Sequence, residues 1–545
     1  MTSQRALLPC SFFVFLSLGL ALRLWNLPDP VIDAMAPRQA QTADAIRSLI
    51  EEPGFQLDSN TSWRGASRPR FVQELPVYNF LAQIVYEGTD FLFYETRPPK
   101  PGGADPPLID MSARIVSVFF WVLTFLTIQT IWSRFLTQRE AFWANGLFVF
   151  APLSVFFGQA VMPEMVFLFI ATGFIVSVLR YSECPTLAKF WMVFISALLA
   201  SLIKMPGFSH LSLFAVAILW RAQGFQFLLR PAHWVAGILI LAAIKSWSGY
   251  VTAINMAGFP EWTSESSLRL FLGDPMARLK PAVYIKVGGY ITAFLLSPLG
   301  VAIAGIGLWQ AIRVRTSEKG FFALAWTASL LFYVLVWGTQ TAGAHSYYNL
   351  PMLIPVAMLF GVGMGASLGW IGRRKSTIFA SAMNTQSFDA RRSTSQILFS
   401  AIVLLLVLTP MGVMTSYLFR EDRALLAAAE WIQTNVPEGK IAAVKLNHSP
   451  YYIDYFHVPT VSYYARRNCF VIGRTMSDEA ISKGLSECEV IVETLPETRD
   501  GMKAFSVAFK GAERNIDTLE RARQSGFEAQ AALVDGLRIW KKPNP

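Results

Sequence analysis

The sequence from Leu24 to Glu74 follows the first apolar segment of the chain and reads LWNLPDPVIDAMAPRQAQTADAIRSLIEEPGFQLDSNTSWRGASRPRFVQE. It contains a carboxylate, Asp33, and a guanidinium, Arg38, and three further arginines lie between Ser62 and Glu74. Those arginines are Arg64, Arg68 and Arg70. Spaced guanidinium groups near a carboxylate suit work on an anionic, lipid-linked substrate at a bilayer surface. A second interpretation stays open here, because charged loops beside membrane segments are often only solvated.

The composition of the whole chain indicates a membrane protein. Of its 545 residues, 53% are hydrophobic and only 15% are charged, whereas soluble domains carry about 25% charged residues. The net charge of +10 does not indicate nucleic-acid binding, because many basic residues gather in short loops on one side of the predicted membrane segments. The chain is therefore predicted to be a polytopic, all-α integral membrane protein.

Eleven apolar segments are predicted to span the membrane as helices, for which about 20 residues are typical. The first lacks a small-residue cleavage site and is expected to be retained rather than removed as a signal peptide. Lys204, Pro206 and Gly207 interrupt one apolar run and predict a turn at a membrane face. The predicted segments are 6–25, 111–133, 141–160, 163–180, 190–203, 208–220, 232–248, 287–312, 320–338, 349–371 and 396–418.

The short loops predict the orientation and the domains. Their arginines and lysines fall on alternate loops, on the same side as Arg5, and this side is predicted to be cytoplasmic. We therefore predict a membrane domain at residues 1–420, which includes a long outer loop at 26–110, and an extracytoplasmic α/β domain at 421–545. Within the outer loop, residues 39–50 and 76–86 are expected to form amphipathic helices at the membrane interface.

The C-terminal domain is predicted from strands that alternate with helices. Its role stays open between a regulatory or substrate-shaping lid and a structural appendage, since it has no recognisable catalytic or nucleotide motif. A disulfide between Cys469 and Cys488 is permitted outside the cytoplasm, but the spacing does not determine it. The expected helices are 423–433 and 516–524, and the expected strands are 441–446, 470–473, 489–493 and 537–540.

Several ionisable residues close to membrane segments share the predicted outer face. Such residues are functional candidates because charge near the bilayer core is rare. Ionisable residues without a common function would be expected on both faces of the membrane, so their grouping on the outer face indicates an active site there. The residues are Asp33, Arg38, Glu74, Glu164, Lys204 and His345.

Short motifs surround these residues. They are Asp33 with Arg38-Gln39-Ala40-Gln41-Thr42-Ala43, Glu74-Leu75-Pro76-Val77-Tyr78, Met162-Pro163-Glu164, Lys204-Met205-Pro206 and His345-Ser346-Tyr347-Tyr348-Asn349-Leu350-Pro351. Together they resemble the lipid-phosphate-dependent glycosyltransferases with the GT-C fold, in the group of glycosyltransferase family 39, protein O-mannosyltransferases and lipid A aminoarabinose transferases. The likeness covers roughly residues 15–360. The sequence departs from the family at Met35 and Pro37, where His and an aromatic residue are usual, and at Glu164, where Asp is usual.

The resemblance implies an inverting transfer of a sugar from a polyprenyl-phosphate donor to a lipid, glycan or protein acceptor. The reaction would take place at the outer, periplasmic face of the cytoplasmic (inner) membrane and modify lipopolysaccharide or a cell-wall glycan. Asp33 is expected to be the general base, with helix capping as the alternative. Binding of the donor phosphate is expected from Arg38, Lys204, Arg64, Arg68, Arg70, His345 and Tyr347. Binding of the acceptor or the sugar is expected from Glu74, Glu164, Gln39 and Tyr348.

Other roles stay open for some of these residues. Glu74 and His345 are also candidate ligands of a divalent metal, although two ligands do not identify one; otherwise no cofactor is expected. Lys204 would alternatively extend to the membrane interface, and Glu164 would favour a helix N-terminus through the helix dipole. Tyr347 and Tyr348 would alternatively belong to an interfacial aromatic belt.

Two other functions compete with glycosyl transfer. A lipid or sugar transporter or flippase is the main alternative, although the sequence shows no internal repeat and no pair of broken helices in matching positions. A catalytically inactive scaffold is the second, and the retained Asp33, Arg38 and Glu74 disfavour it. The identity of the sugar and of the acceptor stays open.

Overall fold

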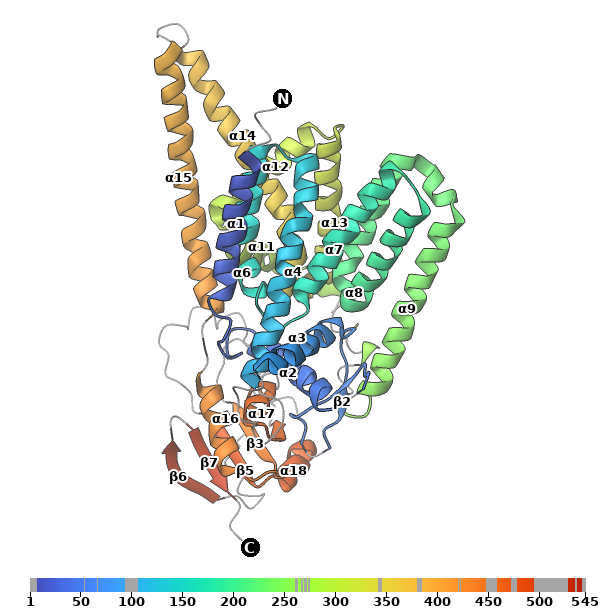
Figure 1. Ribbon diagram of the computed structural model, residues 1–545, viewed down its shortest axis with the longest axis vertical. Helices are drawn as coiled ribbons and strands as arrows, with labels where there is room; N and C mark the ends of the chain where they lie inside the picture. The colour runs from blue at the N-terminus through green and yellow to red at the C-terminus, as the bar shows by residue number, and fades with distance from the viewer. Residues whose placement is uncertain are drawn as a thin grey trace. The chain divides into compact units, whose positions relative to one another are not determined.

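The computed structural model describes most of the chain, and Figure 1 shows its helices and strands. The described residues are 7–52, 54–65, 67–93, 106–259, 263–265, 268, 272, 275–341, 346–379, 385–419, 421, 423–446, 458–471, 478–494, 528–534 and 537–541. They divide into two compact units. The helical unit comprises Met1–Leu27, Ser117–Tyr250 and Ser264–Leu418, and the mixed unit comprises Pro28–Val116, Val251–Thr263 and Phe419–Pro545. This division differs from the predicted boundary at residue 420, because the first loop and the C-terminal region belong to the same unit.

The helical unit consists of long apolar helices. Among the described residues, seven helices are long and apolar enough to cross a membrane, or up to eight if one bent pair counts as a single span. The eleven-span topology stays a prediction. The elements are α1 (Leu7–Leu24), α4 (Pro106–Phe135), α5 (Gln138–Phe150), α6 (Pro152–Phe157), α7 (Glu164–Glu183), α8 (Leu187–Gln223), η2 (Gly224–Leu229), α9 (Pro231–Asn255), η4 (Pro275–Leu279), α11 (Pro281–Ile291), η5 (Thr292–Leu296), α12 (Pro298–Arg313), α13 (Glu318–Thr341), η6 (Ser346–Met352), α14 (Leu353–Phe379) and α15 (Thr385–Leu418).

The turn predicted at Lys204 divides α8 into two halves. Lys204 has non-helical backbone angles, φ −153° and ψ 79°. A straight helix of 37 residues would be about 55 Å long at about 1.5 Å per residue. However, the rings of Phe190, near the start of α8, and Phe227, just after its end, both lie 6.1 Å from the ring of His233. The two halves therefore run back alongside each other, and Lys204 lies at the reversal.

A second break lies at Ser297. The helices on either side, Pro281–Leu296 and Pro298–Arg313, are bent by 99°. Ser297 has a φ of +71°, in the left-handed region that non-glycine residues rarely adopt, and its side chain accepts a hydrogen bond from the backbone N–H of Gly300 at 3.3 Å. The expectation of one continuous helix over 287–312 is therefore wrong.

Glycines bring α12 and α14 into backbone contact. A Cβ atom on Gly307 would lie 1.9 Å from the carbonyl oxygen of Leu359, and one on Gly363 would lie 1.9 Å from the carbonyl oxygen of Ile303. No side chain fits at either position without moving a backbone. Small residues of this kind let helices pack closely in a membrane, where the hydrophobic effect does not drive association.

The mixed unit is built on a five-stranded sheet with the strand order β4-β3-β5-β7-β6. β3 runs parallel to both β4 and β5, whereas β7 is antiparallel to both β5 and β6. A short antiparallel pair, β1 and β2, lies in the first loop. The elements are α2 (Ala36–Glu51), β1 (Ser59–Asn60), β2 (Arg70–Phe71), α3 (Val77–Phe93), α16 (Arg423–Asn435), β3 (Ala442–Leu446), α17 (Val458–Ala465), β4 (Cys469–Val471), α18 (Asp478–Glu487), β5 (Val490–Thr494), β6 (Glu528–Val534) and β7 (Leu537–Lys541).

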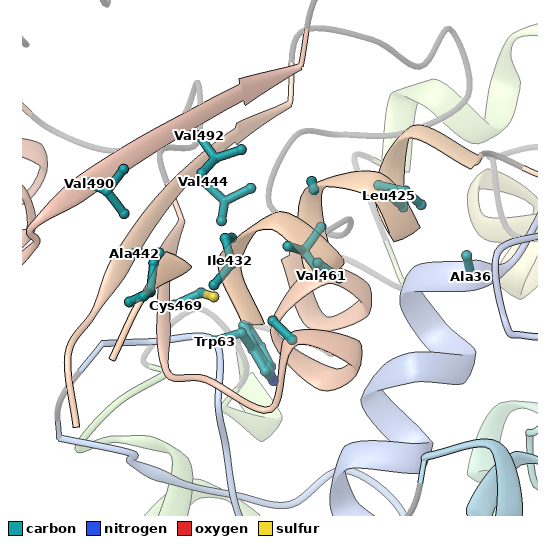
Figure 2. Close-up of a cluster of buried hydrophobic side chains, with 14 of the residues drawn as sticks. Ala36, Trp63, Leu425, Ile432, Ala442, Val444, Val461, Cys469, Val490 and Val492 are labelled. Carbon is teal, nitrogen blue, oxygen red and sulfur yellow. The ribbon is translucent and has the colours of Figure 1, made fainter. Parts of the chain in front are cut away.

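One apolar core holds the first loop and the C-terminal region together. Figure 2 shows Ile432 of α16 and Val461 of α17 beside Val444 of β3, with Trp63 and Ala36 of the first loop at the same core. All five side chains are buried. Because burial of apolar surface is the main stabilising term in folding, the loop after α1 is expected to fold only together with residues near the end of the chain.

Most predicted elements of the mixed unit are confirmed. Helices occur at the predicted 39–50, 76–86 and 423–433, and strands occur at 441–446, 489–493 and 537–540, with small shifts at their ends. The strand predicted at 470–473 corresponds to β4, Cys469–Val471. The helix expected at 516–524 lies outside the described residues. α17, α18 and β6 were not predicted. Cys469 and Cys488 are buried free thiols, so the structure does not contain a disulfide between them.

Candidate active site

Asp33 lies in the turn between α1 and α2, with 9% of its surface exposed. Its Oδ1 accepts hydrogen bonds from the Met35 backbone N–H at 3.1 Å and from Gln39 Nε2 at 2.6 Å. Both donors use the same oxygen, and among the described residues Oδ2 has no hydrogen-bond partner. The N-cap residue of α2 is Met35 and no side chain caps this helix, so Asp33 does not act as its cap. Asp33 retains one carboxylate oxygen that can accept a proton.

Burial changes the acidity of this carboxyl group. It raises the pKa of Asp33 from 3.8 to about 6, because an apolar surrounding disfavours the charged form. The Arg114 guanidinium and the hydrogen bonds from Met35 and Gln39 lower the pKa, and Glu421 raises it slightly. A carboxylate with a pKa close to neutral is a better proton acceptor than an ordinary exposed one.

Arg114 is a candidate that the sequence-based reasoning missed. It lies on α4 with 1% of its surface exposed, and its Nε has no hydrogen-bond partner among the described residues. Its charge acts on both Asp33 and Asp110. Arg114 falls inside the predicted segment 111–133, where an ionisable residue is unusual, and this signal could have identified it.

Arg38 and Glu74 form an ion pair, 2.5 Å from Nη2 to Oε2. Arg38 also donates to Gln41 Oε1 at 2.9 Å. The proposed metal ligand Glu74 is therefore already bound to a guanidinium, and its predicted partner His345 lies outside the described residues. Within the described residues, no three or more His, Cys, Asp or Glu side chains are grouped as a metal site would require. The metal stays a prediction.

The other arginines of the first loop differ from one another. Arg70 is paired with Asp58 at 3.1 Å and with Glu52 at 3.8 Å, so its charge is largely neutralised locally. The guanidinium of Arg64 lies 4.8 Å from the centre of the Phe259 ring. Arg68 has a left-handed backbone, with a φ of +39°.

A second group of predicted residues meets in the helical unit. The ammonium of Lys204 forms a buried ion pair with Oε1 of Glu164, which begins α7. The same ammonium lies 4.6 Å from the centre of the Tyr347 ring and 5.6 Å from that of Tyr348. These are cation–π distances. The break in α8 therefore places the Lys204 ammonium beside a carboxylate and two aromatic rings. These buried contacts disagree with the alternative in which Lys204 extends to the membrane interface.

Buried polar atoms without partners lie near this ion pair in the sequence. The second oxygen of Glu164 and both amide atoms of Gln159 are buried and have no hydrogen-bond partner among the described residues. The hydroxyl of Ser346, next to Tyr347, is also buried and has no hydrogen-bond partner among these residues. Since unsatisfied buried polar groups cost about 1–3 kcal/mol each, such atoms indicate a place for a polar ligand or for ordered water.

A known protein family matches part of the chain. The family model described as dolichyl-phosphate-mannose-protein mannosyltransferase matches residues 86–257. This stretch contains Arg114, Glu164 and Lys204. No curated protein matches the chain.

Solved structures match a larger share of the chain. ArnT from Cupriavidus metallidurans bound to undecaprenyl phosphate has a TM-score of 0.58 at 13% identity, over 97% of each chain, and its apo state has a TM-score of 0.57 at 14% identity. The oligosaccharyltransferase AglB from Archaeoglobus fulgidus, in complex with an inhibitory peptide and a dolichol-phosphate, has a TM-score of 0.51 at 12% identity. That match covers 91% of this chain and 70% of AglB.

At these identities the structural likeness concerns the fold. It agrees with the family model, which describes an enzyme that takes its sugar from a lipid phosphate. The resemblance inferred from the sequence motifs is confirmed: the mannosyltransferase family model matches residues 86–257, and the solved structures of ArnT and AglB share the fold.

Proposed function

We propose that this protein is an inverting glycosyltransferase that takes a sugar from a polyprenyl-phosphate donor and uses Asp33 as the general base. The observation that carries the proposal is the environment of Asp33. Its carboxyl group is buried, its pKa is raised to about 6, and one of its oxygens has no hydrogen-bond partner among the described residues. Such a group is deprotonated at neutral pH, yet it is basic enough to take a proton from a hydroxyl in the transition state.

The reaction is a single displacement. The acceptor oxygen forms a bond to the anomeric carbon while its proton passes to Asp33 Oδ2. The bond between the anomeric carbon and the phosphate oxygen breaks, and its electron pair leaves with the polyprenyl phosphate. Attack opposite the leaving group inverts the configuration of the anomeric carbon.

The leaving phosphate gains negative charge, and fixed cations stabilise that charge. We assign this role to Arg114 and Arg38 of the mixed unit, which also carries Asp33. The expected contribution of Lys204 is a separate proposal within the helical unit. Within the mixed unit Arg38 is paired with Glu74, and within the helical unit Lys204 is paired with Glu164. These carboxylates hold the cations in place and reduce the cost of burying them.

The sugar is assigned to polar atoms of the helical unit that have no hydrogen-bond partner in the described part of the chain. The free oxygen of Glu164 and the amide of Gln159 suit the hydroxyls of a sugar, with the rings of Tyr347 and Tyr348 as stacking surfaces. The acceptor, a lipid, a glycan or a protein, is assigned to the outer face of the cytoplasmic membrane. No step is assigned to a metal, because a metal at Glu74 would have to displace the guanidinium of Arg38.

The test is a transfer assay with purified protein and a panel of polyprenyl-phosphate sugars. Wild-type protein is expected to release polyprenyl phosphate from one donor, and both Asp33→Asn and Asp33→Ala are expected to lose that activity while they still bind the donor. Donor binding is measured by thermal stabilisation. Full turnover in Asp33→Asn would falsify the assignment of the base.

The same assay separates transfer from transport. The breaks at Lys204 and Ser297 interrupt two apolar helices, a feature that transporters also use. In proteoliposomes, a transporter would move the labelled donor across the bilayer with the sugar still attached. A transferase would instead release the lipid phosphate and label the acceptor.

A further inference from the structure

Two adjacent tyrosines of α17 bind one buried aspartate on α4. The Tyr464 hydroxyl donates to Asp110 Oδ2 at 2.5 Å, and the Tyr463 hydroxyl donates to Asp110 Oδ1 at 2.9 Å. Asp110 is 1% exposed. It lies four residues before Arg114, one helical turn away on the same face of α4. A segment of the C-terminal region is therefore bonded to the helix that carries the charge beside Asp33.

Tyr464 has a further bond that Tyr463 lacks. Its hydroxyl oxygen accepts a hydrogen bond from the backbone N–H of Val31 at 2.5 Å. Val31 is fully buried and lies two residues before Asp33. Tyr463 instead lies 3.0 Å from the carbonyl oxygen of Pro106, at the start of α4. One hydroxyl group thus joins the turn that carries Asp33 to the helix that carries Arg114.

We propose that Tyr464 is a positioning residue for glycosyl transfer: it ties Val31 to Asp110 and so holds Asp33 at its place beside Arg114. This inference rests on the proposed role of Asp33 as the base. It gives the C-terminal region a function in the reaction, although none of its residues carries a recognisable catalytic motif.

The contacts around α17 support a fixed position for Tyr464. Arg47 of α2 donates to the backbone carbonyl of Tyr463 at 3.2 Å, and its guanidinium lies 5.5 Å from the Tyr463 ring. Ser62 of the first loop donates to Ser462 at 3.1 Å. α17 is therefore bonded to α2, to the first loop and to α4, and a tyrosine held in this way loses little further side-chain entropy when it binds Val31.

Release of this bond is expected to let water reach Asp33. The charged groups that act on Asp33 are Arg114 and Asp110 on α4 and Glu421 after α15, and Gln39 on α2 donates to it. None of them is removed when Tyr464 changes, so the main effect is the loss of burial. Since burial is the first cause of the raised pKa of Asp33, that pKa is expected to fall from about 6 toward its ordinary value.

The experiment compares Tyr464→Phe with Tyr463→Phe. Each variant removes one hydroxyl that binds Asp110, but only Tyr464→Phe removes the bond to Val31. Hydrogen–deuterium exchange is measured by mass spectrometry on peptides that cover residues 28–35, and kcat is measured from pH 4.5 to pH 8. The first readout needs no activity, and the second reports the protonation of the base.

In Tyr464→Phe, the peptide over residues 28–35 is expected to exchange faster than in wild type, and kcat at pH 7 is expected to fall about tenfold or more, because small displacements of a catalytic group are costly. The ratio of kcat at pH 5 to kcat at pH 7 is expected to rise from about one tenth to above one half, as follows from a base whose pKa falls from about 6 toward about 4. Tyr463→Phe is expected to lower thermal stability but to leave both the exchange and that ratio unchanged.

Several outcomes decide against the proposal. Fast exchange of the Val31 amide in the wild-type protein would overturn it without any variant. Equal effects of the two variants on the pH ratio would show that both tyrosines only stabilise the fold. The two proposals can also fail separately. Faster exchange in Tyr464→Phe together with full activity in Asp33→Asn would support the bond between Tyr464 and Val31 but would rule out Asp33 as the base.

Discussion

Asp33 and Glu164 are both buried carboxylates, but their partners differ. Glu164 forms an ion pair with Lys204. Asp33 is bound by an amide side chain and a backbone N–H, and the Arg114 guanidinium acts on it through its charge without forming an ion pair with it. A carboxylate that holds a cation suits binding and positioning, whereas one that lacks such a partner can take up a proton. Burial alone therefore does not distinguish these two carboxylates, and the proposal that Asp33 is the base rests on the different partners that they have.

The largest effect is expected from Asp33→Asn. It keeps the shape of the side chain and removes the proton acceptor, so kcat is expected to fall by about 10² to 10⁴. Donor turnover by purified protein is the measurement. The matched control is Asp29→Asn, a carboxylate on the same loop, which is expected to keep wild-type turnover. Comparable losses in both variants would mean that the loop tolerates no change and that Asp33 has no special role.

The Lys204–Glu164 pair is expected to respond to single and double changes in different ways. Lys204→Met leaves the Glu164 carboxylate buried without its cation, at a cost of about 3–5 kcal/mol in stability. The double variant Lys204→Met/Glu164→Gln is expected to recover most of that loss but to stay inactive with donor. Thermal unfolding and donor turnover are measured side by side. Recovery of activity in the double variant would assign the pair to structure alone.

Arg114 is expected to set the pH range of activity. Its positive charge lowers the pKa of Asp33, so Arg114→Gln is expected to raise that pKa above about 6 and to move the acidic limb of the kcat profile to higher pH, by on the order of one unit. Arg114→Lys keeps the charge and is expected to leave the limb near its wild-type position. A limb that stays in place in both variants would contradict the electrostatic influence of Arg114 on Asp33.

The smallest effect concerns stability. The pKa of Asp33 is raised in the folded protein, so its charged form is disfavoured there. The folded state is relatively more stable below the ordinary pKa of about 4, and this contribution is lost as the pH rises through about 6. Asp33→Asn is therefore expected to unfold at a higher temperature than wild type at pH 8, with little difference at pH 4. An equal Tm at both pH values would indicate that Asp33 is solvated.

The local part of this arrangement was predictable from the sequence. Asp33, Arg38 and Glu74 lie on one loop, and the helix that follows Asp33 and the turn at Lys204 were expected from periodicity and from the Pro-Gly pair. Arg114 was hidden because a single charge does not interrupt an apolar segment, so the segment was interpreted as a span only. The bond between Tyr464 and Asp110 joins residues 354 positions apart, and no local pattern records such a contact.

The bend at Ser297 could have been predicted from the residue pair at this position, but not from hydropathy. Ser297 precedes Pro298, and residues before proline avoid helical angles. The apolar residues on both sides nevertheless form one continuous run, which favoured a single span. The grouping of the first loop with the C-terminal region was also not predictable, because a shared core such as that of Trp63 and Ile432 depends on the complete fold.

The contact between Gly307 and Gly363 has a consequence for biosynthesis. α13 lies between α12 and α14 in the chain, so α12 enters the membrane before its partner exists, and the two backbones can meet only after α14 has been made. The contact is therefore a late assembly step. A larger residue at either glycine would leave every helix inserted but unable to join, and quality control, not loss of an active-site group, would remove such a protein from the cell.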